Sequence, residues 1–234
     1  MILLDKRMEA VLKLMVPCEE AVDVGADHGW VSAAILERGL ARRVTACDIS
    51  APSLEKAKRL ARQRGLEEQM RFLVANGFSG YAPVGSFCAV IAGMGGELIA
   101  DILSRGGETP RKALRLVMQP MGGAAELRAW LLQNGYAILD ETVIRQGQRF
   151  YQLIAAGWRG GRSAPLPPWE ALEFGPVALE KKEQDLLELL KKTRRARMKQ
   201  LEQAEKAGVE LPKLSVELAA VERLLAEWEE MDET

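Results

Sequence analysis

The sequence contains few of the residues that hold proteins together through covalent links or metals. Its 234 residues include one histidine and three widely separated cysteines with no CxxC pair: Cys18, Cys47 and Cys88. This spacing argues against a disulfide framework or a zinc site, so we predict free thiols and no bound metal. Free thiols are typical of a cytoplasmic protein, and cytoplasmic is the location we expect.

Long apolar runs and a net charge are missing as well. No run approaches the roughly 18 apolar residues of a membrane span, and the amino terminus is charged at Asp5, Lys6, Arg7 and Glu9, unlike a signal peptide. We therefore expect no membrane partner. The formal net charge of −1 indicates no nucleic-acid partner by itself, although a local basic stripe could still contact RNA.

The first two thirds of the sequence alternate short apolar runs with helical patterns. Five runs are typical of strands: 21–25, 43–49, 70–76, 87–94 and 113–120. Four helical patterns lie between them, several closed by a glycine: 29–39, 50–65, 96–106 and 123–135. Alternation at this spacing predicts βαβ units and a parallel sheet buried on both faces.

Two further strand-like runs, 136–146 and 149–157, are separated by about two residues. So short a link requires an antiparallel hairpin, because a parallel return needs a crossover of about a dozen residues or more. Five parallel strands followed by a terminal hairpin are unusual in dinucleotide dehydrogenases and usual in Rossmann-like methyltransferases. We therefore predict an α/β fold of the class I S-adenosylmethionine-dependent methyltransferase type.

The composition changes after residue 157. Residues 157–169 are rich in Gly, Pro, Ser and Arg, which is typical of a linker or surface loop. From residue 176 onward, residues that favour helices dominate. We assign three parts: a Rossmann-like domain at 1–160, a linker at 161–175 and a helical domain at 176–234.

The helical domain shows two amphipathic patterns, separated by Gly208 and Pro212. The first carries a broad apolar stripe: Leu179, Leu186, Leu190 and Leu201. The second repeats apolar residues at steps of four and three: Leu214, Leu218, Val221, Leu225 and Trp228. We predict an antiparallel coiled-coil hairpin that serves packing, dimerisation or the binding of a partner, and we expect a monomer rather than a dimer.

The stretch Gly25-Ala26-Asp27-His28-Gly29 follows the first strand directly. Ligands of parallel sheets bind where loops leave the carboxyl ends of strands, and glycines let the backbone approach them. The dinucleotide-binding fingerprint has a glycine where this chain has Asp27, so a pyrophosphate would be repelled. S-adenosylmethionine carries no phosphate, and its ammonium and sulfonium groups are positive, so acidic residues favour it.

Polar residues follow the ends of the next strands in the order that this cofactor requires. Asp23 suits the methionine ammonium, Asp48 suits the two ribose hydroxyls, and Asn76 suits the amino group and ring nitrogen of adenine. The segment AGMGG, residues 92–96, follows the fourth strand, where the methyl acceptor usually lies in this fold. The predicted cofactor-binding residues are Asp23, Gly25, Asp27, Asp48, Ile49, Asn76, Gly77, Ala92 and Gly93.

Together these motifs resemble a known family, the bacterial tRNA (adenine(22)-N1)-methyltransferases, or TrmK-like proteins, along essentially the full length of the chain. The resemblance rests on a D-[IV]-G-x-D-H loop (23–28), AGMGG (92–96), Q-P (119–120), LR-x-WL (127–131) and Glu141. It implies methyl transfer from S-adenosylmethionine to N1 of an adenine in the D-arm of tRNA. The chain departs from the family at DHGWVS, where DHAYLP is usual, and at Asn76, where an Asp is common.

Adenine N1 is a neutral nucleophile at pH 7, so the chemistry requires alignment with the S–CH₃ bond rather than a strong base. The product is a cation, which nearby carboxylate or carbonyl oxygens stabilise. We therefore predict four catalytic residues: Asp27, His28, Gly93 and Met94. Asp27 could instead cap the next helix and His28 could cap local backbone.

RNA contact is predicted at two places. The target base must leave its stack, and Trp30 and the Gln119–Pro120 turn are candidates for stacking on it. A basic stretch in the helical domain is expected to bind the tRNA backbone, assisted by the amino terminus. With Trp30, the predicted RNA-binding residues are Lys6, Arg7, Lys191, Lys192, Arg194, Arg195, Arg197 and Lys199.

Three alternatives remain open on the residues alone. A methyltransferase acting on a small molecule or a protein would share the cofactor site but would not bind tRNA. A non-catalytic protein of the same fold would bind the cofactor without turnover and use the hairpin as a scaffold. An NAD-dependent oxidoreductase is disfavoured by Asp27 and by the terminal hairpin.

Overall fold

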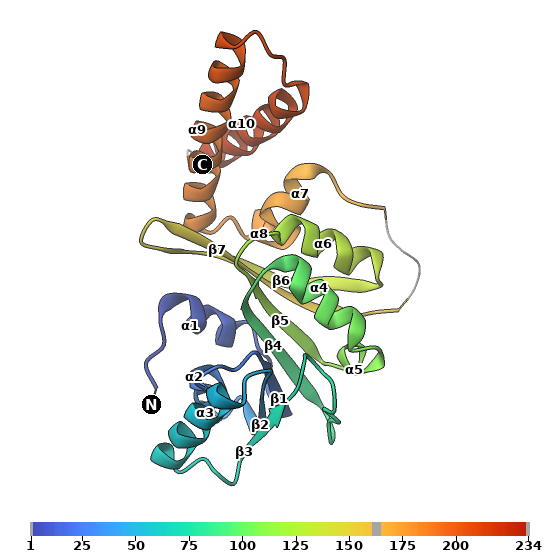
Figure 1. Ribbon diagram of the computed structural model, residues 1–234. Coiled ribbons are helices and arrows are strands. Elements are labelled where there is room, and N and C mark those ends of the chain that lie inside the picture. The colour runs from blue at the N-terminus through green and yellow to red at the C-terminus, as the bar shows by residue number, and fades with distance from the viewer. Residues whose placement is uncertain (1, 161–164, 233–234) are drawn as a thin grey trace.

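The computed structural model describes residues 2–160 and 165–232, with side chains described up to residue 229. Its centre is one seven-stranded sheet with the order β3-β2-β1-β4-β5-β7-β6 (Figure 1). The strands are β1 (Cys18–Val24), β2 (Ala41–Asp48), β3 (Met70–Val74), β4 (Phe87–Met94), β5 (Arg115–Pro120), β6 (Tyr136–Gln146) and β7 (Arg149–Trp158). All seven predicted strands are present, with differences of a few residues at their ends.

All strands of the sheet run parallel except β7. β1 pairs in parallel with both β2 and β4, while β7 runs antiparallel to β5 and to β6. The strand order therefore reverses between β1 and β4, which is the position where ligands bind in open α/β sheets. The predicted parallel sheet with a terminal hairpin is confirmed.

Helices cover both faces of the sheet. The first face packs against α1 (Lys6–Lys13), α2 (Trp30–Glu37) and α3 (Ala51–Arg64). The second packs against α4 (Gly96–Arg105), α5 (Glu108–Arg111) and α6 (Ala124–Gln133). The sequence analysis did not predict α1, although Asp5 marks its start by accepting a hydrogen bond from the Met8 N–H at 2.8 Å.

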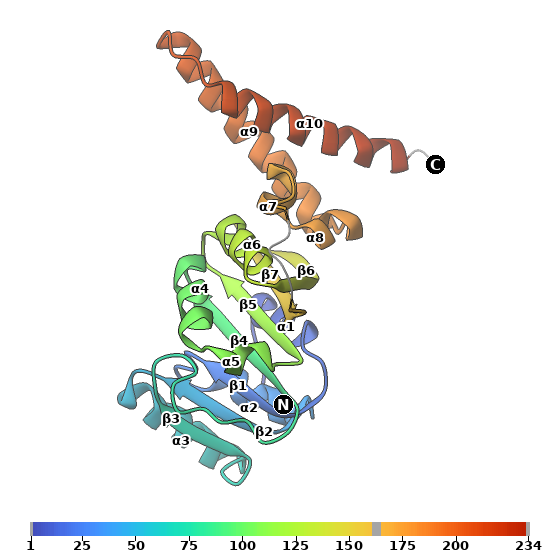
Figure 2. The same ribbon diagram turned by 90° about the vertical axis from the view of Figure 1, so that its right-hand side faces the viewer.

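Four helices follow the sheet: α7 (Trp169–Phe174), α8 (Pro176–Lys181), α9 (Gln184–Lys206) and α10 (Pro212–Asp232). The first residues of the predicted linker, 161–164, lie outside the described part of the chain, and residues 169–174 of that linker form α7. In Figure 2 the α9–α10 hairpin projects away from the β6–β7 end of the sheet, and α10 returns at an angle to α9. The predicted helical hairpin is therefore present.

The apolar core of the hairpin is concentrated at its base. Leu186 and Leu190 of α9 and Val221 and Leu225 of α10 are buried together with residues of α7, α8 and β6. Leu214 and Leu218 are half-buried, whereas Val221, Leu225 and Trp228 are buried, so the predicted seam is most deeply buried toward the base of the hairpin. At this base the hairpin packs against α7, α8 and β6, and we call this contact region the joint between the hairpin and the sheet.

A buried ion pair holds that joint. Arg128 of α6 and Glu141 of β6 are 1% and 0% exposed at their side chains, and Arg128 Nε donates to Glu141 Oε1 at 2.5 Å. The rest of the guanidinium donates to the Leu172 carbonyl of α7 at 2.7 Å and to Gln152 Oε1 of β7 at 2.7 Å. Glu141 Oε2 accepts from the Val177 N–H of α8 at 3.0 Å. Burial raises the pKa of the Glu141 carboxyl, and Arg128 opposes that rise.

We expect Arg128→Ala to lower the free energy of unfolding by about 3–5 kcal/mol, because it leaves the Glu141 carboxylate buried without its counter-ion. Arg105→Ala, which breaks the exposed Arg105–Asp101 pair of α4, should change it little. Urea denaturation of both variants measures the difference. If the two variants were equally stable, the ion pair would not hold the joint; the double variant Arg128→Met/Glu141→Leu should recover much of the loss.

Candidate active site

The loops that carry the predicted site residues gather at one edge of the sheet. In the register, Val24 at the end of β1 lies beside Cys47 of β2 and Ile91 of β4. The carboxyl ends of these parallel strands therefore meet (Figure 1), and each is followed by a segment singled out from the sequence. The predicted cofactor residues are brought together at this edge.

The loop after β1 has an unusual backbone. Gly25 and Gly29 have φ of +80° and +75°, and Asp27 has φ of +45°, which is uncommon for a residue with a side chain. The N–H groups of Gly25 and Ala26 donate to the Cys47 carbonyl at 2.8 and 2.9 Å. The loop is thus tied to β2, and the left-handed conformation of Asp27 leaves its side chain largely exposed.

Asp48 links the loops after β1 and β2. Its Oδ2 accepts from the Asp27 N–H at 3.0 Å and its Oδ1 accepts from the Ser50 N–H at 2.8 Å. A carboxylate oxygen has further acceptor capacity. Asp48 is therefore oriented by the backbone and can accept from a pair of hydroxyl groups.

Asp23 is the buried acid of the site. It is 4% exposed, and Ser32 Oγ of α2 donates to its Oδ2 at 2.6 Å. Burial raises the pKa of Asp23 to about 6; the Ser32 hydrogen bond lowers it, and the charge of Asp48 raises it. A cation brought to this edge would relieve the cost of burying the carboxylate charge.

The loops after β4 and β5 pack against each other through their backbones. The Met121 N–H donates to the Met94 carbonyl at 2.7 Å, and the Gly96 N–H donates to the Gly122 carbonyl at 2.8 Å. A Cβ at Gly96 would lie 2.1 Å from the Gly123 oxygen. The Met94 carbonyl, predicted to face the substrate, is therefore engaged inside the protein. The Met94 methyl lies over the loop after β1, 2.2 Å from where a Cβ of Gly25 would be.

Gln119 ties α1 to this pair of loops. It is fully buried, and its Oε1 accepts from Arg7 at 2.9 Å and from the Gly93 N–H at 3.2 Å. The Arg7 guanidinium also lies 5.3 Å from the centre of the Tyr151 ring. Two expectations are therefore corrected. Gln119 is buried and cannot stack on a base. The Arg7 guanidinium, which was expected to contact RNA, instead contacts Gln119 and the Tyr151 ring.

His28 and Trp30 are accessible beside the loop after β1. The His28 side chain is 43% exposed, with Nε2 3.5 Å from Asp27 Oδ1 and 2.9 Å from Lys56 Nζ of α3. An ammonium donates here, so Nε2 accepts in this arrangement. Trp30 is 47% exposed. Sequence reasoning missed Lys56 and Ser32, since contacts between helices and loops leave no local pattern.

Three further predicted residues line the same edge. Ile49, directly after Asp48, is 73% exposed, an unusual state for an apolar side chain in a buried sheet. Asn76 is exposed and Gly77 is buried, with φ of +65°. Ile49 and Asn76 are therefore accessible beside Asp48.

The predicted RNA-binding residues divide into two groups. Lys192, Arg194, Arg195 and Lys199 are exposed on α9. Three of the others form ion pairs with carboxylates of the protein: Lys6 with Asp185 at 2.7 Å, Lys191 with Glu188 at 3.4 Å, and Arg197 with Glu217 at 3.0 Å. Arg197 also lies over the Trp169 ring at 5.8 Å, so it faces α7 and α10, contrary to the expectation of a phosphate contact.

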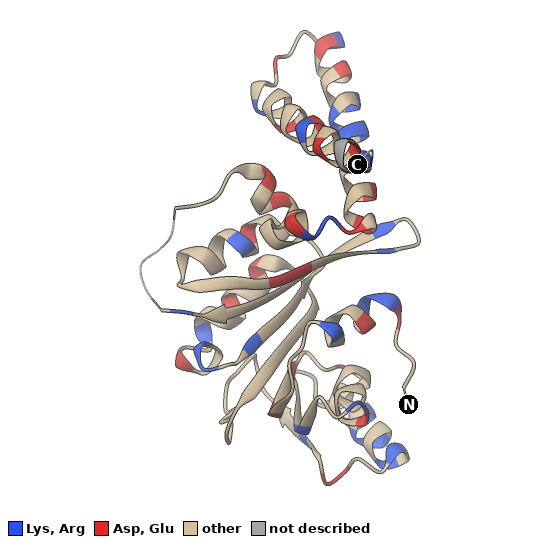
Figure 3. Ribbon diagram, turned by 180° about the vertical axis from the view of Figure 1, so that it is seen from behind, with Lys and Arg blue, Asp and Glu red and all other residues tan. Residues whose placement is uncertain are grey.

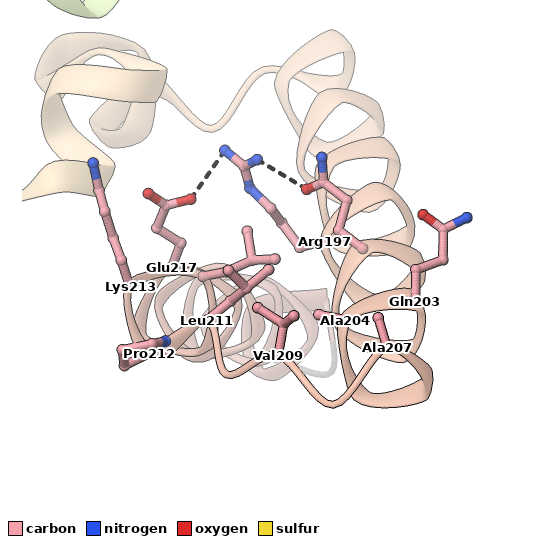
Figure 4. Close-up of a pocket in the computed structure, with 11 residues that line it drawn as sticks. Arg197, Gln203, Ala204, Ala207, Val209, Leu211, Pro212, Lys213 and Glu217 are labelled. Atoms are coloured by element: carbon pink, nitrogen blue, oxygen red, sulfur yellow. Dashed lines mark hydrogen bonds and ion pairs between the residues drawn. The ribbon is translucent and has the colours of Figure 1, made fainter.

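A cavity of about 730 Å³ lies at the tip of the α9–α10 hairpin (Figure 4), which projects away from the sheet (Figure 1). Val209 and Leu211 contribute apolar surface, and the Arg197–Glu217 pair lies at one side. It contains none of the strand-end acids. The strand edge, by which we mean the edge of the sheet at the carboxyl ends of β1, β2 and β4, is therefore the better candidate for the active site.

The strand edge fits a cationic nucleoside better than a nucleotide. It offers one buried and one oriented carboxylate, Asp23 and Asp48, and an exposed apolar side chain, Ile49. A phosphate would meet like charges there, whereas ammonium, sulfonium and ribose groups would meet acceptors. In the described part of the chain, no cluster of His, Cys, Asp or Glu side chains could hold a metal, and no helix is long and apolar enough to cross a membrane.

Comparison with known proteins agrees with this assignment. A family model described as a methyltransferase domain matches residues 4–154. The tRNA (adenine(22)-N(1))-methyltransferase of Bacillus subtilis is 28% identical over 194 residues, which are 78% of this chain and 81% of that protein.

Solved structures of similar proteins match almost the whole chain. A Streptococcus pneumoniae protein crystallised with S-adenosyl-L-methionine has a TM-score of 0.80 at 25% identity and covers 95% of this chain and 100% of its own. The m1A22 tRNA methyltransferase TrmK of B. subtilis has a TM-score of 0.76 at 24% identity and covers 97% and 99%. The match includes the helical domain as well as the sheet.

We expect Gly96→Ala to separate the loops after β4 and β5, because the new methyl group would overlap the Gly123 carbonyl. Gly95→Ala is the matched control, since a Cβ there meets nothing within 4 Å. Thermal unfolding and cofactor titration should show a clear loss for Gly96→Ala and little change for Gly95→Ala. Equal behaviour would mean that the contact between the two loops is not needed.

The raised pKa of Asp23 predicts a pH-dependent stability. Below about pH 4 the carboxyl is protonated in both the folded and unfolded chains and costs nothing. As the pH rises through about 6, the buried group ionises and the folded state loses up to about 3 kcal/mol. Asp23→Asn should therefore become more stable than the wild type by about that amount between pH 4 and pH 7 in denaturant titrations; a constant difference would contradict the assignment.

Proposed function

Because the chain belongs to the methyltransferase domain family, we propose that it transfers a methyl group from S-adenosylmethionine to N1 of adenine 22 in the D-arm of tRNA. The observation that carries the proposal is the acid-lined carboxyl edge of the sheet, on a chain similar in sequence to a named tRNA (adenine(22)-N(1))-methyltransferase over most of both lengths. The similarity of the whole fold, helical domain included, supports it.

The cofactor is held by the strand-end residues. The Asp23 carboxylate attracts the methionine ammonium, directly or through water, since Ser32 already donates to one of its oxygens. Asp48 accepts from the ribose hydroxyls with the acceptor capacity that Asp27 and Ser50 leave free. Ile49 covers the adenine ring and Asn76 reads its edge, with Gly77, Ala92 and Gly93 shaping the walls. The bound cofactor supplies a methyl group on a positively charged sulfur.

The residues of the chain position the acceptor rather than activate it. Adenine N1 is neutral at pH 7 and attacks along the line of the S–CH₃ bond once it is held there. The Gly93 backbone is fixed by Gln119, which gives the loop after β4 a defined place beside the loop after β1. The Asp27 carboxylate, exposed on the loop after β1, stabilises the positive charge that appears on the methylated ring.

His28 and Trp30 act on the substrate side of the loop. Trp30 offers an exposed indole on which an adenine turned out of the tRNA stack can lie. His28 orients the base while Lys56 holds its Nε2, and it removes a proton late in the reaction only after Nε2 is released from Lys56. The exposed cations of α9, Lys192, Arg194, Arg195 and Lys199, contact the RNA backbone. We propose a monomeric cytoplasmic protein for this role.

The test is methyl transfer to tRNA. The protein, S-adenosylmethionine and unmodified tRNA with adenine at position 22 are incubated, and the digested RNA is analysed for 1-methyladenosine by mass spectrometry. We expect the product with adenine at that position and none when guanine replaces it. Cofactor binding without product would overturn the tRNA assignment and favour another acceptor or a non-catalytic role.

A further inference from the structure

A second cavity lies where the turn between β6 and β7 meets α9. It has a volume of about 440 Å³ and is lined by Arg145, Gln148, Phe150, Glu188, Lys192 and Arg195. We call this group the cation cavity, since it contains three cationic side chains and one carboxylate. None of its residues from the β6–β7 hairpin was singled out from the sequence. Figure 3 shows basic segments at the tip of the β6–β7 hairpin and along α9.

An aromatic ring and carbonyl groups orient Lys192 and Arg195 of this cavity, while Arg145 also forms a long ion pair with Glu188. Lys192 Nζ and the Arg145 guanidinium lie 5.2 and 5.8 Å from the centre of the Phe150 ring. Lys192 donates to the Gln148 carbonyl at 3.3 Å, and Arg195 Nε donates to the Lys191 carbonyl at 3.2 Å. An aromatic ring and carbonyl groups position a cation but leave its full charge in place. Glu188 approaches Arg145 only at 3.8 Å, so the cavity keeps a net positive charge.

The register places this cavity at the reactive edge of the sheet. β7 runs antiparallel to β5 with Met118 opposite Ile154, so residues before Ile154 lie toward the carboxyl end of β5. Phe150 and the turn before it therefore extend past Pro120, the last residue of β5. Phe150 also lines a neighbouring cavity of about 350 Å³ together with Pro120 and residues 121–126. One aromatic side chain thus separates the cation cavity from the loop after β5.

The positive charge continues along α9. Lys192, Arg195 and Lys199 are exposed and recur at spacings of three and four, which puts them on one face of the helix. Arg197 lies on the opposite face, where it pairs with Glu217. We call the three exposed residues the α9 stripe. The stripe leads from the cation cavity toward the tip of the α9–α10 hairpin.

We propose that the cation cavity binds a phosphodiester of the RNA close to the nucleotide that enters the active site, and that Lys199, farther along the α9 stripe, binds a phosphate that follows it. The inference rests on the proposed function, because it takes the substrate to be an RNA. The carboxylates of the cofactor loops and the cations of the cavity then lie on one edge of the sheet. The RNA backbone is drawn to the cations while the base, which carries no negative charge, enters the acidic side.

The first test is the salt dependence of tRNA binding, measured by fluorescence anisotropy. Lys192→Gln should weaken binding and reduce the slope of log K against log salt by about 0.7–0.9, the value for one lost phosphate contact. The triple variant Arg145→Gln/Lys192→Gln/Arg195→Gln should reduce it by about 2 and weaken binding at least about tenfold. Lys112→Gln is the matched control: Lys112 is exposed beside the amino end of β5, at the opposite edge of the sheet.

Kinetics and phosphate mapping then locate the contact. The triple variant should raise the KM for tRNA while kcat and cofactor affinity stay near the wild-type values. Single methylphosphonate substitutions near adenine 22 should weaken binding of the wild type and have a smaller effect on Lys192→Gln. Sensitive phosphates found only far from adenine 22 would overturn the proposed location.

The outcomes separate this inference from the proposed function. If the wild type forms no 1-methyladenosine in tRNA, the proposed function fails. If it forms the product and the triple variant keeps both the wild-type affinity and the wild-type salt slope, the cation cavity does not bind RNA: the inference fails together with the backbone contacts of Lys192 and Arg195, while the proposed methyl transfer stands.

Discussion

The buried ion pair between Arg128 and Glu141 fixes the geometry on which both halves of the protein depend. Two charges taken out of water carry a desolvation cost of several kcal/mol each, and they are tolerated only when every remaining polar atom has a partner. Here the partners come from β7, α7 and α8, so satisfying the pair forces the helical domain into one orientation on the sheet. Gly175, with φ of +93°, lies so close to Glu141 that a Cβ would overlap its carboxylate. These contacts therefore allow one orientation of the helical domain on the sheet.

The same principle operates at the carboxyl edge of the sheet, where backbone groups hold the chemistry in place. Asp48 is bound by two amide N–H groups, and Gly93 is bound by a buried glutamine. The loops after β4 and β5 then pack against each other at Gly96, where a side chain has no room. A site that only aligns two reactants gains most from such rigidity, since small displacements of the reacting atoms are costly.

The features that sequence reasoning predicted correctly are those with a local signal. The period of the apolar residues located the strands, and the two-residue link between β6 and β7 required an antiparallel hairpin. The strand-end residues Asp23, Asp48 and 92–96 came together because all carboxyl ends of a parallel sheet lie at one edge. In each case a short stretch of sequence was sufficient to define the geometry.

The features that were missed depend on contacts between distant segments. Nothing in the neighbours of Arg7 shows that its guanidinium reaches Gln119, 112 residues away, or that Lys56 reaches His28. The basic stretch of α9 appears uniform in the sequence, yet helix geometry sends Arg197 toward Glu217 and leaves Lys192 and Arg195 exposed. Burial along α10 likewise depends on distant segments, because Val221, Leu225 and Trp228 pack with residues of α7, α8 and β6.

The separation of charge explains why a chain with a net charge of −1 can suit both a cation and a polyanion. Buried or oriented carboxylates lie beside β1 and β2, whereas the exposed cations lie on the β6–β7 turn and α9. The two kinds of charge therefore lie on different loops of one sheet, and the buried pair of Arg128 and Glu141 fixes the position of the helical domain, which carries α9, relative to the sheet, which carries the acids.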